Sequence, residues 1–208
     1  MRGVIYMDFQ SSLKKAIEIV KLNEKAISEV SKDTEAWKMG LLILAIGGLL
    51  SGIANYIFSS AVSSVLPGMM QGIARSASAA SIISAPIGSI IGAFIGVGIV
   101  FLFVKIFSGK AGYMQLFAPV AFGSILGWLS ILNIIPVVGW LINFAAGIWS
   151  IVVLIIIVRK VNAFTTGKAV LAVLLPMIIV GIILAVLAAM ATVFAGAGML
   201  GAMNTGIF

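Results

Sequence analysis

The side chains on which most enzyme chemistry depends are rare in this chain. It contains no cysteine and no histidine, and its carboxylates all precede residue 39: Asp8, Glu18, Glu24, Glu29, Asp33 and Glu35. Thiol catalysis, disulfides and imidazole ligands are therefore excluded. Intramembrane hydrolysis needs paired carboxylates, a metal or an activated nucleophile, and proton-coupled transport usually relays through Asp, Glu or His. We therefore predict a non-enzymatic protein with no cofactor and no metal site.

Lysine and arginine are the only charged side chains after residue 38. Five of them flank apolar stretches and are candidate contacts for lipid headgroups or for a partner: Lys105, Lys110, Arg159, Lys160 and Lys168. Basic side chains beside a bilayer attract anionic headgroups. No basic stripe with interleaved aromatic residues is present, so nucleic acid is not an expected partner.

The composition indicates an integral membrane protein. Of the 208 residues, 62% are hydrophobic and 9% are charged, whereas soluble domains carry about 25% charged residues. Five continuous apolar stretches reach the length of about 20 residues that a membrane-spanning helix needs: 40–62, 84–106, 113–132, 137–158 and 169–194. We predict an all-α fold, a five-transmembrane-helix bundle over 39–195, followed by a Gly-rich tail over 196–208. The short uncharged connection at Asn133–Pro136 predicts an antiparallel hairpin.

The distribution of Lys and Arg among the connections predicts the orientation. Seven lie in the N-terminal segment, two follow the second span and three follow the fourth. That side of the membrane therefore has twelve, against Arg75 alone on the other. Basic loops stay in the cytoplasm, so we expect the N-terminus there and the C-terminus outside. In a prokaryote this would be the cell membrane.

The first 38 residues are predicted to form a cytoplasmic amphipathic helix. Apolar residues share one face at helical spacing: Phe9, Leu13, Ala16, Ile17, Val20 and Ile27. Charged residues cluster opposite them: Lys14, Glu18, Lys21, Lys25, Glu29 and Lys32. Glu24 interrupts the apolar stripe, and Asp33 is the expected N-cap of the next helix. Three interpretations stay open: the helix lies in the headgroup region, docks on the cytoplasmic loops of its own chain, or recruits a protein partner through 1–32.

Small residues four apart are the clearest pattern in the spans. They predict faces on which helices pack closely: Gly48 and Gly52; Gly88, Gly92 and Gly96; Gly123 and Gly127; Gly181, Ala185 and Ala189. Packing within one bundle explains the repetition on four spans, and a homodimer face or a sliding surface is the alternative. Pro176 lies inside the fifth span and predicts a kink, which serves either as shape or as a hinge or binding site.

Several short segments together resemble the Yip family, the Ypt/Rab-interacting membrane proteins, and in particular its prokaryotic branch. Their order over residues 33–195 carries the resemblance: Asp33–Gly40, Gly109–Leu116, Ile135–Gly139, Ile148–Ser150, Thr166–Ala169 and Leu175–Pro176. The resemblance implies a five-helix bundle with a cytoplasmic N-terminus. Eukaryotic relatives bind prenylated Rab-type GTPases and carry a proline-containing acidic motif before the first span. Val30–Trp37 has no proline here, so the Rab-binding role is not carried over.

Two functions from different classes follow. The first is a Yip-type membrane protein that organises or recruits partners or lipids, using its cytoplasmic helix and its basic loops against anionic headgroups. The alternative is a small transporter or channel for a solute, an ion or a lipid. Its path would run between the glycine-lined second span and the fifth span.

Overall fold

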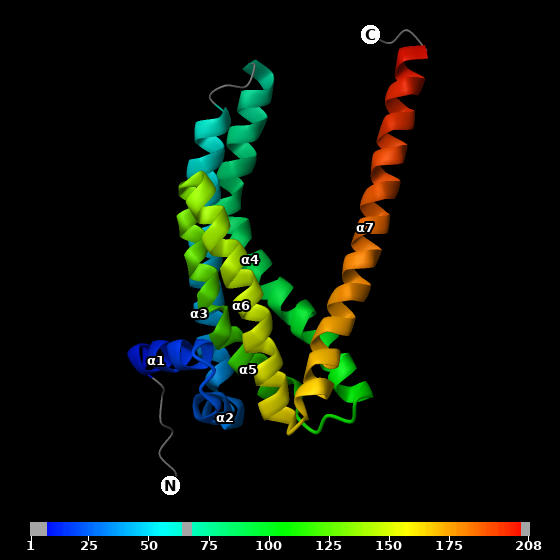
Figure 1. Cartoon of the computed structure of the whole chain (residues 1–208). Helices are drawn as coiled ribbons and strands as arrows, with labels where there is room; N and C mark the ends of the chain where they lie inside the picture. The colour runs from blue at the N-terminus through cyan, green and yellow to red at the C-terminus, as the bar shows by residue number, and fades with distance from the viewer. Residues whose placement is uncertain (1–7, 64–67, 205–208) are drawn as a thin grey trace.

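The computed structural model describes residues 8–63 and 68–204, and all its regular secondary structure there is helical. Within these ranges the side chains of the following residues are not described: 62, 63, 68–75, 77, 136 and 194–204. Two short helices precede five long helical segments (Figure 1). In chain order the elements are α1 (Phe9–Val20), α2 (Glu24–Lys32), α3 (Ala36–Ser63), α4 (Gly68–Ile106), α5 (Tyr113–Gly123), the 3₁₀ helix η1 (Ser124–Ile134), α6 (Pro136–Asn162) and α7 (Thr166–Asn204).

The predicted fold class is confirmed. Five helical segments of the described chain are long and apolar enough to cross a membrane: Ala36–Ala61, Ser78–Ile106, Tyr113–Ile134, Val137–Asn162 and Thr166–Val193. The helices differ from the expected spans by a few residues at several ends and by about ten or more at two. Helix α4 already begins at Gly68, so Arg75 lies in a helix rather than in a loop. Helix α7 continues to Asn204, through most of the expected Gly-rich tail.

The N-terminal segment forms two helices where the sequence predicted one. The chain breaks between Val20 and Glu24, where Leu22 adopts a left-handed backbone with φ of 64°. Asn23 then caps α2, because its side-chain oxygen accepts hydrogen bonds from the amides of Lys25 and Ala26. Local capping and one left-handed residue therefore override a periodicity that runs on through the break.

Helices α3 and α4 pack face to face through the predicted glycines of α3. A Cβ added at Gly48 would lie 2.5 Å from the Cα of Pro86, and one added at Gly52 would lie 2.6 Å from the Ser81 carbonyl oxygen. Only glycine leaves room for a backbone this close. The hydroxyl of Ser89 donates to the Leu44 carbonyl at 3.0 Å, which links the helices beside the contact. Gly48 and Gly52 are thus packing residues, as predicted.

The predicted hairpin joins α5 and η1 to α6. Pro136 occupies the first turn of α6, where a missing amide costs little. The side-chain NH₂ group of Asn143 donates hydrogen bonds to the Leu129 and Gly139 carbonyls and to the side-chain oxygen of Asn133. These bonds link the two arms of the hairpin beside the turn. A 3₁₀ helix rises about 2.0 Å per residue against about 1.5 Å in an α-helix. Because of this larger rise, α5 and η1 together span about the same axial length as α6, which has more residues.

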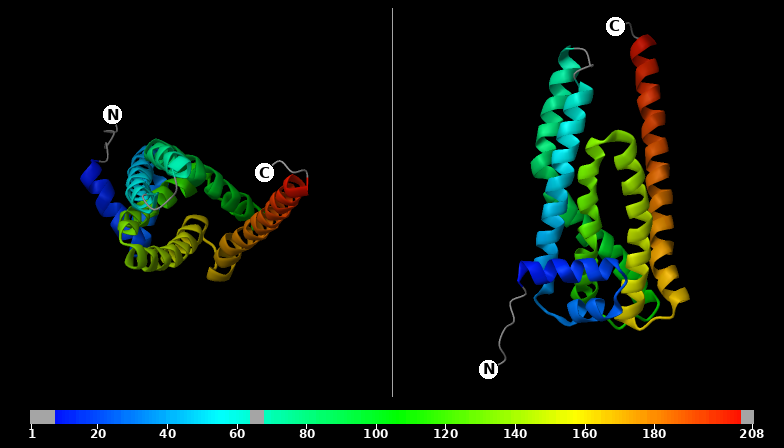
Figure 2. Two further views of the ribbon diagram at one scale, coloured as in Figure 1. Left: turned by 90° about the horizontal axis from the view of Figure 1, so that it is seen from above. Right: turned by 60° about the vertical axis from the view of Figure 1, so that its left-hand side comes forward.

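Helix α7 joins the rest of the bundle at one end only. Its first turns are buried at Ala169, Ala172 and Val173, whereas its side chains from Met177 onward are mostly exposed. Figures 1 and 2 show α7 diverging from the other helices toward the C-terminus. The two termini lie at opposite ends of the molecule (Figure 1). We call the end that carries α1 and α2 the base, and the opposite end the far end.

Candidate functional site at the base

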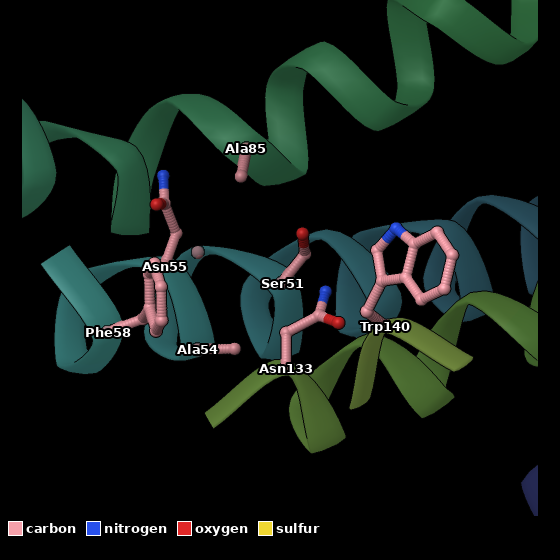
Figure 3. Close-up of a pocket in the computed structure, with 8 residues that line it drawn as sticks. Ser51, Ala54, Asn55, Phe58, Ala85, Asn133 and Trp140 are labelled. Carbon is pink, nitrogen blue, oxygen red and sulfur yellow. The ribbon is translucent and has the colours of Figure 1, made fainter. Parts of the chain in front are cut away.

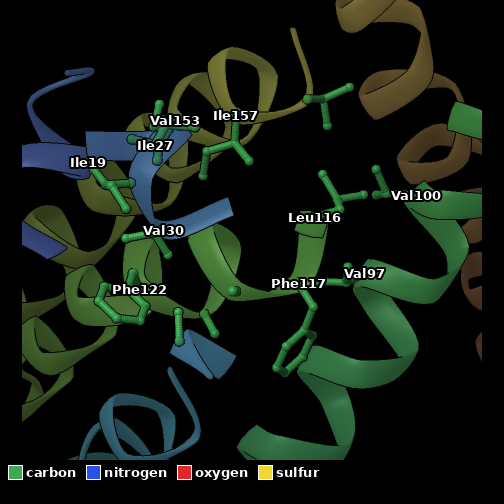
Figure 4. Close-up of a cluster of buried hydrophobic side chains, with 14 of the residues drawn as sticks. Ile19, Ile27, Val30, Val97, Val100, Leu116, Phe117, Phe122, Val153 and Ile157 are labelled. Atoms are coloured by element: carbon green, nitrogen blue, oxygen red, sulfur yellow. The ribbon is translucent and has the colours of Figure 1, made fainter. Parts of the chain in front are cut away.

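The apolar core of the molecule lies at the base, where α1 and α2 pack against α5 and α6. Ile19, Ile27 and Val30 from the N-terminal helices are fully buried, as are Phe117 and Phe122 of α5 (Figure 4). Burial of side chains of this size contributes roughly 2 kcal/mol each. The N-terminal helices are therefore an integral part of the fold. They dock on their own chain, but on the helices α5 and α6 rather than on its cytoplasmic loops.

Helix α1 lies across the long helices rather than along them (Figures 1 and 2). Its buried face consists of Ser12, Ala16 and Ile19, which are all fully buried. At its end the indole nitrogen of Trp149 in α6 donates to the carbonyl oxygen of Val20 at 2.9 Å. Trp149 lies ten residues before Arg159, a helical distance of about 15 Å. The end of α1 therefore docks well inside the length of α6.

An ion pair sets the rotation of α1 about its own axis. The amine of Lys15 lies 3.3 Å from the carboxylate of Glu29 in α2, and α2 is nearer than α1 to the end of the base (Figure 1). Residues two positions apart point about 160° apart around a helix. Leu13 and Ile17 are therefore turned away from α2, toward the long helices' far end. Ile17 leaves 46% of its surface exposed, and Phe9 on the same flank is also exposed.

Glu24 ties the start of α2 to the end of α6. Its carboxylate binds the guanidinium of Arg159 and lies 2.9 Å from the amine of Lys160. Hydrogen bonds from Lys160 and Arg159 and the charge of Lys160 hold the pKa of Glu24 below its ordinary value of 4.5. Glu24 interrupts the apolar stripe in the sequence, and in the structure its ion pairs join α2 to α6.

The five candidate headgroup or partner contacts have different surroundings. Arg159 and Lys160 are engaged by Glu24. The amine of Lys105 donates to the carbonyls of Gly109 and Ala111, at 3.1 and 2.8 Å, and so braces the loop after α4. Lys110 and Lys168 are exposed and make no ion pair within the described chain. Their role toward headgroups or a partner stays a prediction.

The small residues predicted for close packing divide into two groups. Gly123 is in contact with Val153 of α6, like the α3 glycines with α4. A Cβ added at any of the others would meet nothing within 4 Å: Gly88, Gly92, Gly96, Gly127 and Gly181. Ala185 and Ala189 are exposed on α7. Helix α7 stays helical across Pro176. The glycine face of α4 is therefore open in the single chain, and a homo-oligomer contact there stays a prediction.

Comparison with known families agrees with this architecture. The Yip1 domain matches residues 19–203. The chain belongs to the Yip1 domain family. The match extends past the segments quoted above, from the end of α1 almost to the end of α7. The Yip1 domain family is non-enzymatic, in agreement with a sequence that has no imidazole or thiol and no carboxylate side chain after residue 38. No curated protein and no solved structure matches the chain.

The sequence pattern did not predict two features of this Yip1-domain base. Ile19 was absent from the predicted apolar face although it is fully buried, whereas Phe9 and Ile17 were on it and are exposed. A strongly amphipathic helix that is apolar over a wide arc can present two neighbouring faces to two different surroundings. The partnership between Glu24 and Arg159 joins residues far apart in sequence, and an acid inside an apolar stripe was its one visible signal.

Proposed function

We propose that this Yip1-domain protein organises lipids of the cytoplasmic leaflet around its base. Helix α1 lies in the plane of the membrane, with one face on the bundle and its exposed apolar flank among lipid chains. The exposed amines of Lys110 and Lys168 lie at the adjacent headgroup level and attract anionic lipids. The interfacial and docked interpretations of the N-terminal helix then both hold, each for one face.

The rotation of α1 is the observation that carries this proposal. The Lys15–Glu29 ion pair turns the charged flank of α1 toward α2 and the end of the base. The apolar flank with Leu13 and Ile17 is left facing the level of the spans. An in-plane amphipathic helix buries such a flank at the boundary between headgroups and acyl chains. In a purely aqueous setting the same exposed flank would be unfavourable.

Spin labels can test the depth of the two flanks directly, because the chain contains no cysteine to interfere. Single-cysteine variants I17C and E18C of the full chain are labelled and reconstituted into phosphatidylethanolamine–phosphatidylglycerol vesicles. We expect the label at residue 17 to collide with dissolved oxygen more than with a water-soluble nickel chelate, and the neighbouring label at residue 18 to show the reverse. Equal preference for the nickel chelate at both positions would overturn the proposal.

The anionic-lipid part of the proposal has its own test. Charge reversal in K110E/K168E should lower the phosphatidylglycerol retained by the purified protein relative to phosphatidylethanolamine. The charge-conserving K110R/K168R variant is the matched control and should retain it, because the attraction is to charge rather than to lysine itself. Unchanged retention in the charge-reversed variant would remove headgroup binding from the proposal and leave recruitment of a protein partner as the role of the base.

Orientation belongs to the same proposal. We place the base, with the N-terminus, in the cytoplasm and the C-terminus outside, because the basic residues of the connections gather at the base. A K168C variant in intact cells of the host should then resist a membrane-impermeant maleimide until the cells are opened. Labelling in intact cells would reverse the orientation. Membership of a prokaryotic branch rests on the segment resemblance alone.

One observation also keeps the transport alternative in view. The glycine face of α4 is open, and α7 diverges from the bundle. A G92L variant meets nothing within 4 Å at its Cβ position, so the fold should tolerate it. If reconstituted wild-type protein moves an ion, solute or lipid and G92L does not, the alternative replaces the lipid-organiser proposal. If the wild type moves none of them, the alternative is excluded.

A further inference from the structure

A cavity of about 490 Å³ lies at the far end, away from the base, between α3, α4 and the tip of the α5–α6 hairpin. Ser51, Asn55 and Phe58 line it from α3, Ala85 lines it from α4, and Asn133 and Trp140 line it from the hairpin. Figure 3 shows the side chains of Ser51, Asn133 and Trp140 gathered around this space. The polar residues come from three elements, α3, η1 and α6, so only the folded chain brings them together.

Four hydrogen-bond donors at this cavity have no acceptor in the described part of the chain. The carboxamide oxygen of Asn55 accepts from Ser59 at 3.0 Å, and that of Asn133 accepts from Asn143 at 3.0 Å. These bonds orient both amides and leave their NH₂ groups unpaired. The Ser51 hydroxyl and the Trp140 indole N–H make no hydrogen bond with described residues either. The cavity therefore offers four donor groups that no described residue pairs.

The unpaired donors and the uncharged lining of the cavity indicate which kind of molecule it can bind. Donors without acceptors fit an oxygen-rich group that accepts hydrogen bonds, such as a phosphodiester or an ester carbonyl. None of the lining residues is charged, so a free phosphate dianion would find no cation to balance its charge. Phe58 and Ala85 provide apolar wall beside the donors, which suits a molecule with a polar centre and hydrocarbon next to it.

The depth of the cavity agrees with a lipid. Trp140 and Arg159 are both in α6 and lie 19 residues apart, which is about 28 Å along the helix. The hydrocarbon core of a bilayer is about 30 Å thick. When Arg159 lies in the headgroup layer of one leaflet, below the docked end of α1, the cavity therefore lies in the opposite leaflet, near its headgroup boundary. Tryptophan is enriched at this level in membrane proteins.

We infer that this cavity binds the phosphodiester and ester oxygens of a glycerophospholipid from the leaflet opposite the base. The inference does not depend on the proposed function of the base, because it rests on different residues at the other end of the molecule. It assigns roles to Asn55 and Asn133 as donors to the lipid, and to Trp140 as both donor and apolar wall.

A photocrosslinker inside the cavity tests the inference. Phe58 of the full chain is replaced by benzoylphenylalanine, and the protein is reconstituted with phosphatidylcholine, irradiated and analysed by mass spectrometry. We expect an adduct of one phospholipid per chain. The S51A/N55A pair removes two donors, each worth about 0.7 kcal/mol, and should lower the adduct yield about tenfold at limiting lipid.

The controls separate a specific site from general lipid contact. T192A removes a hydroxyl on the exposed face of α7, where Thr192 bonds only its own helix at Ala189, and should leave the yield unchanged. Ser51 makes no hydrogen bond that its loss would break, so S51A alone should fold normally and still lower the yield. Equal yields in all variants would overturn the inference. So would loss of the adduct to inorganic phosphate as competitor, because the site would then serve a water-soluble phosphate.

Discussion

The indole nitrogen of Trp149 lies 2.9 Å from the carbonyl oxygen of Val20, so a residue in the middle of α6 holds the last residue of α1. This carbonyl is one of those that the end of a helix leaves without an internal partner. The bond therefore satisfies two polar groups and docks α1 at a defined height on the bundle. Several predictions about the base depend on this docked position.

The first prediction concerns the loss of this bond. W149F keeps an aromatic side chain but removes the donor, which should cost about 1 kcal/mol of docking free energy. The buried Ser12 reports on docking when it is replaced by the nearly isosteric cysteine in this cysteine-free chain. We expect the maleimide labelling rate of S12C to rise roughly fivefold when W149F is added. W140F is the control, because Trp140 lies at the far end, and it should leave the rate unchanged.

Glu24 predicts a pH dependence of stability. Its pKa is lowered in the folded protein by Lys160 and Arg159, so its contribution is fully present above the ordinary pKa of 4.5. It is lost as the pH falls through the lowered folded-state pKa. The difference in melting temperature between wild type and E24Q should therefore be constant near neutral pH and shrink in acid.

E35Q is the matched control for that measurement. Glu35 pairs with Lys38, three residues along the chain, and so makes no ion pair between α2 and α6. E35Q should therefore lower the melting temperature at neutral pH less than E24Q does, because an exposed ion pair within one short segment contributes little to stability. A difference between wild type and E24Q that persists unchanged at pH 3 would show that the Glu24 carboxylate does not hold the base closed.

Ser12 predicts a stabilising substitution. Its hydroxyl is fully buried on α1 and has no hydrogen-bond partner. An unpaired buried hydroxyl costs about 1 kcal/mol or more relative to an apolar group of the same shape. S12A should therefore raise the melting temperature of the protein in detergent. A lower melting temperature would mean that the hydroxyl has a partner in the membrane-embedded protein.

Two glycines predict opposite tolerances to the same substitution. G48A would bring a methyl group within 2.5 Å of the Pro86 Cα and 2.8 Å of the Ala85 carbonyl oxygen. Forcing α3 and α4 apart should cost about 1–3 kcal/mol. G92A meets nothing within 4 Å and should be neutral or slightly stabilising, because alanine is the better helix former. Thermal melts of both variants in the same detergent decide this, and equal losses would refute the packing difference.

Contact between two copies of the chain through the glycine face of α4 would change the result expected for G92A. If G92A lowers the melting temperature and also the fraction of crosslinked dimer in membranes, the open glycine face of α4 is an interface between copies of the chain. If neither changes, the face contacts lipid. The sequence pattern at Gly88, Gly92 and Gly96 is the same in both cases, so this comparison is the one that distinguishes them.

The sequence by itself determined the class of the protein and its five spans, and it marked the small residues at which helices could pack closely. These follow from local properties: continuous apolar length matches the bilayer thickness, and small residues four apart share a helix face. The predicted N-cap at Asp33 is wrong: Asp33 is the C-cap of α2, and its hydrogen bond from the Glu35 amide lies in the turn before α3, which begins at Ala36.

Only the tertiary structure decided which glycines are in contact and which way α1 faces. The periodicity at Gly92 is as regular as that at Gly48, yet α4 covers Gly48 and no described residue covers Gly92, because contact depends on where neighbouring helices lie. Leu22 ends α1 by adopting a left-handed backbone conformation, which a leucine in the sequence does not predict. The pairing of Glu24 with Arg159 and of Trp149 with Val20 joins residues more than a hundred positions apart, and such partners are chosen by the fold rather than by spacing.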